Sequence, residues 1–136
     1  MKVWYGFGTE HSMNLVMIGR FQDAAAAETV RRIIEEFKFA VQADETAGRL
    51  TVGEPSRIYS DEILRLLMQT NIHNIGPDEL EQFLYDVNVT REGDSIVITT
   101  DETSVEAFLK LMLSKGARVE VYSAHDYPDT PYGRGR

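Results

Sequence analysis

The segment that decides the fold is residues 14–37, NLVMIGRFQDAAAAETVRRIIEEF. Its four consecutive apolar residues, 15–18, predict a strand with both faces covered, because a strand with one wet face alternates apolar and polar residues. Asp23 has the side chain of a helix N-cap, whose carboxylate accepts a backbone N–H of the first turn. Residues 24–43 then predict an amphipathic helix, because apolar side chains recur at helical spacing: Ala26, Val30, Ile33, Ile34, Phe37 and Val41.

A second segment, residues 95–116, repeats this pattern. SIVITTDETSVEAFLKLMLSKG again runs from an apolar strand through an acidic cap into an amphipathic helix. Residues 103–106, Thr-Ser-Val-Glu, match a capping box at the start of that helix, and Gly116 favours its end. Two such halves place both long helices on one face of an antiparallel sheet.

The remaining elements lie around these two halves. The sequence predicts strands over 2–7 and 118–123, a short edge strand over 49–52, helices from Ser60 and Pro77, and a hairpin over 87–99. Without the first strand and the two middle helices, the order is β-α-β-β-α-β, which is the ferredoxin-like order. We therefore expect an α+β fold: a ferredoxin-like antiparallel sheet with helices on one face, an extra N-terminal strand and a two-helix insertion at 60–86. Residues 1–127 would form one domain, followed by an extended or disordered tail over 128–136.

The net charge of −8 lies entirely in one segment. Residues 76–106 contain one base, Arg91, and nine acids: Asp78, Glu79, Glu81, Asp86, Glu92, Asp94, Asp101, Glu102 and Glu106. Attraction of this segment to nucleic acid or to an anionic membrane is therefore not expected. Three alternatives remain for it: a solvated face, a surface for a basic protein partner or one that imitates nucleic acid, and a divalent-cation site.

The composition also indicates a compartment and excludes some chemistry. The chain has no cysteine, so disulfides and zinc–thiolate sites are excluded and the cytoplasm is the expected location. The N-terminus has no signal-peptide pattern, and no apolar run approaches the ~20 residues of a membrane span.

The stretch Gly6–Asn14, GFGTEHSMN, is the candidate functional site. Glu10, His11 and Ser12 are the candidate catalytic residues, because a histidine near neutral pH serves as a general base beside a hydroxyl. The candidate ligand-binding residues are Gly8, Thr9, His11 and Asn14. Neighbouring side chains in an extended segment diverge, so catalysis there would need help from elsewhere, such as His125 or Asp126. The alternative is a loop with glycine turns and polar caps.

Cofactors and metals have little support in the sequence. The Gly6-Phe7-Gly8 pair lacks the third glycine of a dinucleotide-binding fingerprint, and no helix follows it at the right place. The three histidines show no metal-ligand spacing, so neither a metal nor a cofactor is expected.

Residues 4–21, WYGFGTEHSMNLVMIGRF, resemble the N-terminal signature of a family of small uncharacterised bacterial proteins, a domain of unknown function. The resemblance covers about the first 25 residues of the printed sequence. It implies a bacterial source, and it assigns no activity and no functional residue.

Three functions remain open. The favoured one is a binding or interaction protein that works as a homodimer, because one side of the strand at 15–18 needs a cover that two helices on the opposite face cannot give. A second copy of the chain would cover it, and the insertion at 60–86 is the alternative cover. The second function is a small enzyme with its site at residues 10–12. The third is an acidic inhibitor or nucleic-acid mimic that binds a basic protein through residues 76–106.

Overall fold

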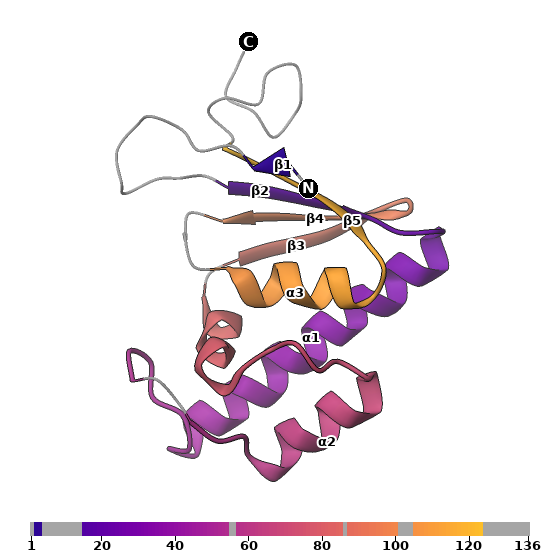
Figure 1. Cartoon of the computed structure of the whole chain (residues 1–136). Helices are drawn as coiled ribbons and strands as arrows, with labels where there is room; N and C mark the ends of the chain where they lie inside the picture. Colours follow the sequence, from indigo (N-terminus) through magenta and orange to yellow (C-terminus); the bar gives the residue numbers. More distant parts are fainter. Residues whose placement is uncertain (1, 4–14, 55–56, 86, 101–104, 124–136) are drawn as a thin grey trace.

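The computed structural model describes residues 2–3, 15–54, 57–85, 87–100 and 105–123 (Figure 1). Its elements are β1 (Lys2–Val3), β2 (Leu15–Arg20), α1 (Ala24–Thr46), α2 (Asp61–Thr70), the 3₁₀ helix η1 (Pro77–Leu84), β3 (Val87–Glu92), β4 (Ser95–Thr100), α3 (Glu106–Ser114) and β5 (Arg118–Ser123). The predicted tail at 128–136 lies outside the described residues.

The five strands form one sheet in the order β1-β5-β2-β4-β3. β5, β2, β4 and β3 are antiparallel to their neighbours, and β1 adds to the edge parallel to β5. The core elements β2-α1-β3-β4-α3-β5 follow the β-α-β-β-α-β order, with α2 and η1 inserted after α1. The expected α+β fold, with its extra N-terminal strand and inserted helices, is therefore confirmed.

The main core fills the space between the sheet and the helices. α1 and α3 lie on the same face of the sheet, and their apolar side chains share one buried cluster with Leu15, Met17 and Val121 (Figure 1). Phe83 of η1 lies between the two helices, with its ring centroid 5.3 Å from that of Phe37 and 4.9 Å from that of Phe108. The prediction that both long helices cover one face is confirmed.

The side chain of Met112 in α3 packs directly on Gly19 in β2. A Cβ at this position would lie 2.6 Å from the Sδ atom of Met112. Glycine in a strand interior often marks such a close approach. The glycine that interrupts the apolar run of β2 therefore makes room for the helix.

The insertion packs on the helix layer and leaves the opposite sheet face alone. Ile63 and Leu67 of α2 and Leu80 of η1 belong to the main core, and Figure 1 shows α2 on the far side of α1 from the sheet. The alternative in which residues 60–86 cover the second face is therefore wrong. Val16, Ile18 and Val97 form a small separate cluster there, and each is less than a tenth exposed. The exposed apolar patch that led us to expect a homodimer is thus not found at these residues.

Two of the predicted helix caps are confirmed, and the third lies partly outside the described residues. Asp23 Oδ1 accepts from the backbone N of Ala26 at 2.8 Å, and Ser60 Oγ accepts from Ile63 N at 3.2 Å. The predicted capping box of α3 begins at residue 103, outside the described residues. Inside the described part, the side-chain carbonyl of Gln82 caps α3 by accepting from Ala107 N at 2.7 Å.

Two local predictions differ from the structure. Residues 49–52 form turns and no strand, although Leu50 is buried. The segment from Pro77 is a 3₁₀ helix, and its buried Leu80 and Phe83 have the three-residue spacing that repeats in such a helix.

Candidate functional site

The site predicted from the sequence lies outside the described residues. This applies to the catalytic candidates Glu10, His11 and Ser12, to the ligand-binding candidates Gly8, Thr9 and Asn14, and to His125 and Asp126. Their roles stay predictions. His73 is described, and its Nε2 lies 2.8 Å from Asn71 Oδ1 on an exposed helix end, in keeping with a local polar contact.

Three acidic side chains of residues 76–106, those of Glu79, Glu81 and Glu106, make contacts within the fold, most of them between distant segments of the chain. Glu79 accepts from Gly76 N at 2.8 Å and pairs with Lys110 Nζ at 2.7 Å. The hydrogen bond that Lys110 donates to Glu79 is the main reason why the pKa of Lys110 is raised. Glu81 accepts from Gly53 N at 3.0 Å, and Glu106 accepts from the side chain of Gln82 at 2.7 Å.

These acids do not gather on one face. Asp78, Glu79 and Glu81 belong to η1, whereas Glu92 and Asp94 lie at the β3–β4 turn, at the other end of the sheet (Figure 1). Asp86, Asp101 and Glu102 lie outside the described residues. The described carboxylates therefore give no support to a surface that imitates nucleic acid.

A hollow with a volume of about 630 Å³ lies between α1 and α2. We call it the α1–α2 groove. It is lined by Glu35, Glu36, Phe39 and Ala40 from α1 and by Glu62, Arg65, Leu66 and Gln69 from α2.

Phe39 is the unusual residue of this groove. It is 77% exposed, whereas Phe37, two positions earlier on the same helix, is fully buried. Two residues along an α-helix turn the side chain by about 200°, so the two rings point to opposite sides of α1. Phe39 therefore presents a large aromatic side chain to solvent, whereas the other apolar lining residues, Ala40 and Leu66, are less exposed and make the floor of the groove.

The charged residues that line the groove beside Phe39 form no ion pair with any described residue, although Glu35 attracts Arg31 one turn earlier on α1. Glu35, Glu36 and Glu62 line the groove against a single base, Arg65. No ion pair within the described part of the chain involves any of these four side chains. The groove thus has an apolar floor, and the charged residues at its rim carry a net negative charge.

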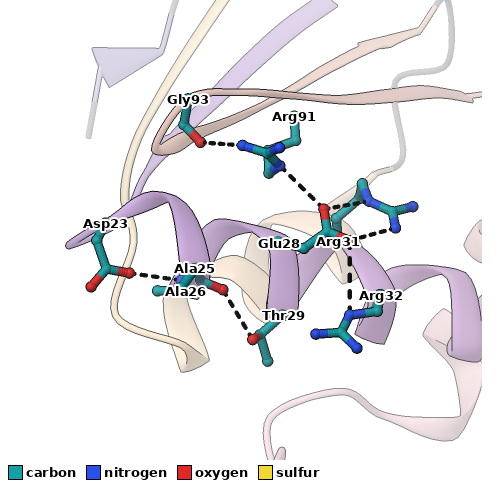
Figure 2. Close-up of polar contacts among 9 residues, drawn as sticks. All are labelled: Asp23, Ala25, Ala26, Glu28, Thr29, Arg31, Arg32, Arg91 and Gly93. Carbon is teal, nitrogen blue, oxygen red and sulfur yellow. Dashed lines mark hydrogen bonds and ion pairs between the residues drawn. The ribbon is translucent and has the colours of Figure 1, made fainter.

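The N-terminal half of α1 is the opposite case. Arg31 donates from Nε and Nη2 to the two carboxylate oxygens of Glu28 at 2.9 and 2.7 Å, and Arg91 Nε of β3 donates to the same carboxylate at 3.1 Å (Figure 2). Arg32 Nε lies 3.8 Å from Glu28 Oε2, and Arg91 also donates to the carbonyl of Gly93 at 2.9 Å. We call these four charged residues the Glu28 cluster.

The Glu28 cluster changes the acidity of its one carboxyl group. The hydrogen bond from Arg31, followed by attraction to that arginine and by the contact with Arg91, lowers the pKa of Glu28 from 4.5 to about 2. Because Arg91 comes from the edge strand, the cluster joins α1 to the β3–β4 hairpin. Its role is structural.

A smaller pocket of about 220 Å³ lies at the C-terminal end of α1. Its wall includes Asp44, whose side chain is 4% exposed and pairs with Arg49 Nε at 3.0 Å. Arg49 also donates its backbone N–H to the carbonyl of Asp44 at 2.9 Å. The pair thus fastens the turn that follows α1, and it brings no second acid or base beside Asp44 for proton transfer.

The described residues lack two further features, a metal-binding cluster and a membrane-spanning helix. They contain no group of three histidine or acidic side chains arranged to hold a metal ion. Among them, no helix combines the length and the apolar character that a membrane crossing requires.

The sequence analysis did not find the α1–α2 groove. Its signal was present: Phe39 is the one large apolar residue of α1 that falls outside the buried stripe. The exposed ring becomes part of a groove only because α2 packs beside it. That packing is a contact between distant segments, which no local sequence pattern shows.

The comparisons with known proteins place the chain in a family. No curated protein and no solved structure matches it. A family model described as "Family of unknown function (DUF6375)" matches residues 1–134, almost the whole chain, and so confirms the expected domain of unknown function over far more than the first 25 residues. This chain belongs to the DUF6375 family of unknown function.

Proposed function

We propose that this protein works by binding, and that the α1–α2 groove receives a basic, amphipathic helical segment of a partner protein. The observation that carries this proposal is the exposed ring of Phe39 in a groove lined by three glutamates that form no ion pair with any described residue.

The apolar floor supplies the anchor. Aromatic residues are enriched at the energetic centre of protein interfaces, where they are buried by the partner and shielded from water by surrounding contacts. Phe39, with Leu66 and Ala40 beside it, offers such a centre. An amphipathic helix that lies in a groove between two helices would cover it with its own apolar side chains.

The rim selects the charge of the partner. Glu35, Glu36 and Glu62 would pair with lysine or arginine on either side of the apolar stripe of the incoming helix. Complementary charge also speeds the encounter of two proteins and disfavours partners of the wrong sign. A second copy of this chain brings the same acidic rim and a net charge of −8, so a homodimer through this groove is disfavoured.

The proposed partner is a basic protein, as expected from the sequence, but the proposed binding site is the α1–α2 groove. The sequence analysis placed the partner on residues 76–106, but all the residues that line the groove lie outside that segment. An enzyme with its site at residues 10–12 stays the alternative, and no described residue favours it.

The test is a selection of helical peptides from a displayed random library against the whole chain. We expect the enriched peptides to carry net positive charge and apolar residues at i, i+3, i+4 and i+7. Their binding should be lost in Phe39→Ser and in Glu36→Lys, because the first removes the anchor and the second reverses the charge of the rim.

Two variants serve as matched controls. Met68→Ser removes an apolar side chain that is 74% exposed on α2 but does not line the groove, and Glu28→Gln removes a glutamate of α1 outside it. Both should bind the selected peptides as the wild type does. Neutral or acidic peptides, or equal binding by Phe39→Ser, would contradict the proposal, as would dimers in sedimentation that dissociate on Phe39→Ser.

A further inference from the structure

Arg20 and Arg118 stand directly opposite each other on neighbouring strands. The register pairs Arg20 of β2 with Arg118 of β5, while Ser95 of β4 lies on the other side of Arg20. Both arginines are exposed. β2 is hydrogen-bonded on both sides, by β4 and β5, so its backbone holds this pair in a fixed position.

Both side chains lie on the sheet face away from the helices. Successive side chains of a strand alternate between the two faces. Ile18 belongs to the small cluster on the face away from the helices, so Arg20 shares that face. Val119 belongs to the main core, so its neighbour Arg118 also points away from the helices.

No carboxylate of the described residues neutralises the pair. Glu120 lies on the same face of β5, yet it is not within ion-pair distance of either guanidinium. In contrast, Arg49 pairs with Asp44, and three other arginines share Glu28. Like charges directly opposite each other destabilise a sheet. Such a pair is unexpected in a chain where acids outnumber lysine and arginine by 22 to 14.

We propose that Arg20 and Arg118 together bind the phosphate of a small phosphomonoester. Opposed residues of an antiparallel pair have Cα atoms about 4.5–5.5 Å apart, so two guanidinium groups can converge on one oxyanion. Each guanidinium presents a planar fork of N–H donors that matches phosphate oxygens. A phosphomonoester carries about −1.5 to −2 charges at pH 7, which matches the two arginines better than a carboxylate does. This surface is separate from the α1–α2 groove, so the two proposals stand independently.

The experiment is a calorimetric titration of the whole chain with phenyl phosphate at constant ionic strength. Benzoate, a monoanion with the same ring, is the matched ligand. We expect phenyl phosphate to bind more tightly than benzoate. Arg20→Gln and Arg118→Gln should each raise the dissociation constant about tenfold or more, because each removes charge-assisted hydrogen bonds to the anion.

Arg57→Gln is the control variant, since it removes an exposed arginine of a loop outside the sheet and should bind as the wild type does. The glutamine variants at 20 and 118 should unfold at temperatures no lower than the wild type, because they relieve a like-charge pair. The proposal is overturned if the wild type does not bind phenyl phosphate or if benzoate binds equally well. It is also overturned if the variant that carries both Arg20→Gln and Arg118→Gln binds phenyl phosphate like the wild type.

Discussion

Two parts of one helix, α1, use the same residue type in opposite ways. Glu28, near its start, is held by Arg31 and Arg91, and its carboxyl group stays ionised far into the acid range. Glu35 and Glu36, about two turns later, line the α1–α2 groove together with the exposed Phe39, and neither forms an ion pair with a described residue. The same residue type therefore joins α1 to the sheet at one end of the helix and lines the groove without an ion pair to any described residue at the other.

The largest difference in stability between two variants of α1 should be between those of its buried ring, Phe37, and its exposed ring, Phe39. Phe37→Ala should lower the free energy of unfolding by about 3–5 kcal/mol, because it leaves a cavity in the stack with Phe83. Phe39→Ala should change it by no more than about 0.5 kcal/mol, as is usual for surface substitutions. Urea unfolding of the two variants measures both values. Similar losses in the two would mean that Phe39 packs in the folded chain and is not a free anchor.

Two glutamines give a contrast of intermediate size. Gln82 is buried, caps α3 through Ala107 and donates to Glu106, whereas Gln69 lines the groove. Gln82→Ala should cost about 1–3 kcal/mol, because it strands a buried N–H donor. Gln69→Ala should have almost no effect on unfolding. If Gln82→Ala were as mild as Gln69→Ala, the cap would not stabilise α3.

The smallest stability effect should come from Glu28, and it should depend on pH. The pKa of Glu28 is lowered from 4.5 to about 2 in the folded chain, so the unfolded chain binds more protons between these values. The stabilisation is therefore complete above pH 4.5 and is lost as the pH falls through about 2.

Urea midpoints measured across this pH range test the point. Glu28→Gln should flatten their decline, because it removes the carboxyl group whose pKa is lowered in the folded chain. An unchanged decline in Glu28→Gln would show that the cluster in Figure 2 does not form a stabilising contact in solution.

The fold could be predicted because its signals are local. The consecutive apolar residues of β2, the cap at Asp23 and the stripe of α1 are all read within about 30 residues, and the second half repeats them. The cap of α3 could not be predicted, because Gln82 is 25 positions from Ala107 in the chain. The predicted loop site at residues 8–14 stays a prediction, since it lies outside the described residues.

The groove and the arginine pair needed tertiary structure. Ile63 and Leu67 of α2 pack into the main core, and this packing places α2 beside α1. The exposed Phe39 indicates a groove only once the position of α2 is known. Arg20 and Arg118 are almost a hundred residues apart and meet only through the β2–β5 register. The sequence holds the side chains of both sites, but the contacts that join them are long-range.

The most direct test of the account is a nuclear magnetic resonance titration of the whole chain with a lysine–leucine peptide whose leucines follow helical spacing. The account predicts that the amides perturbed most lie in residues 35–40 and 62–69, that a scrambled peptide of the same composition perturbs them far less, and that Phe39→Ser abolishes the effect. Perturbations centred on the sheet, or an equal response in Phe39→Ser, would contradict the claim that the α1–α2 groove is the binding site.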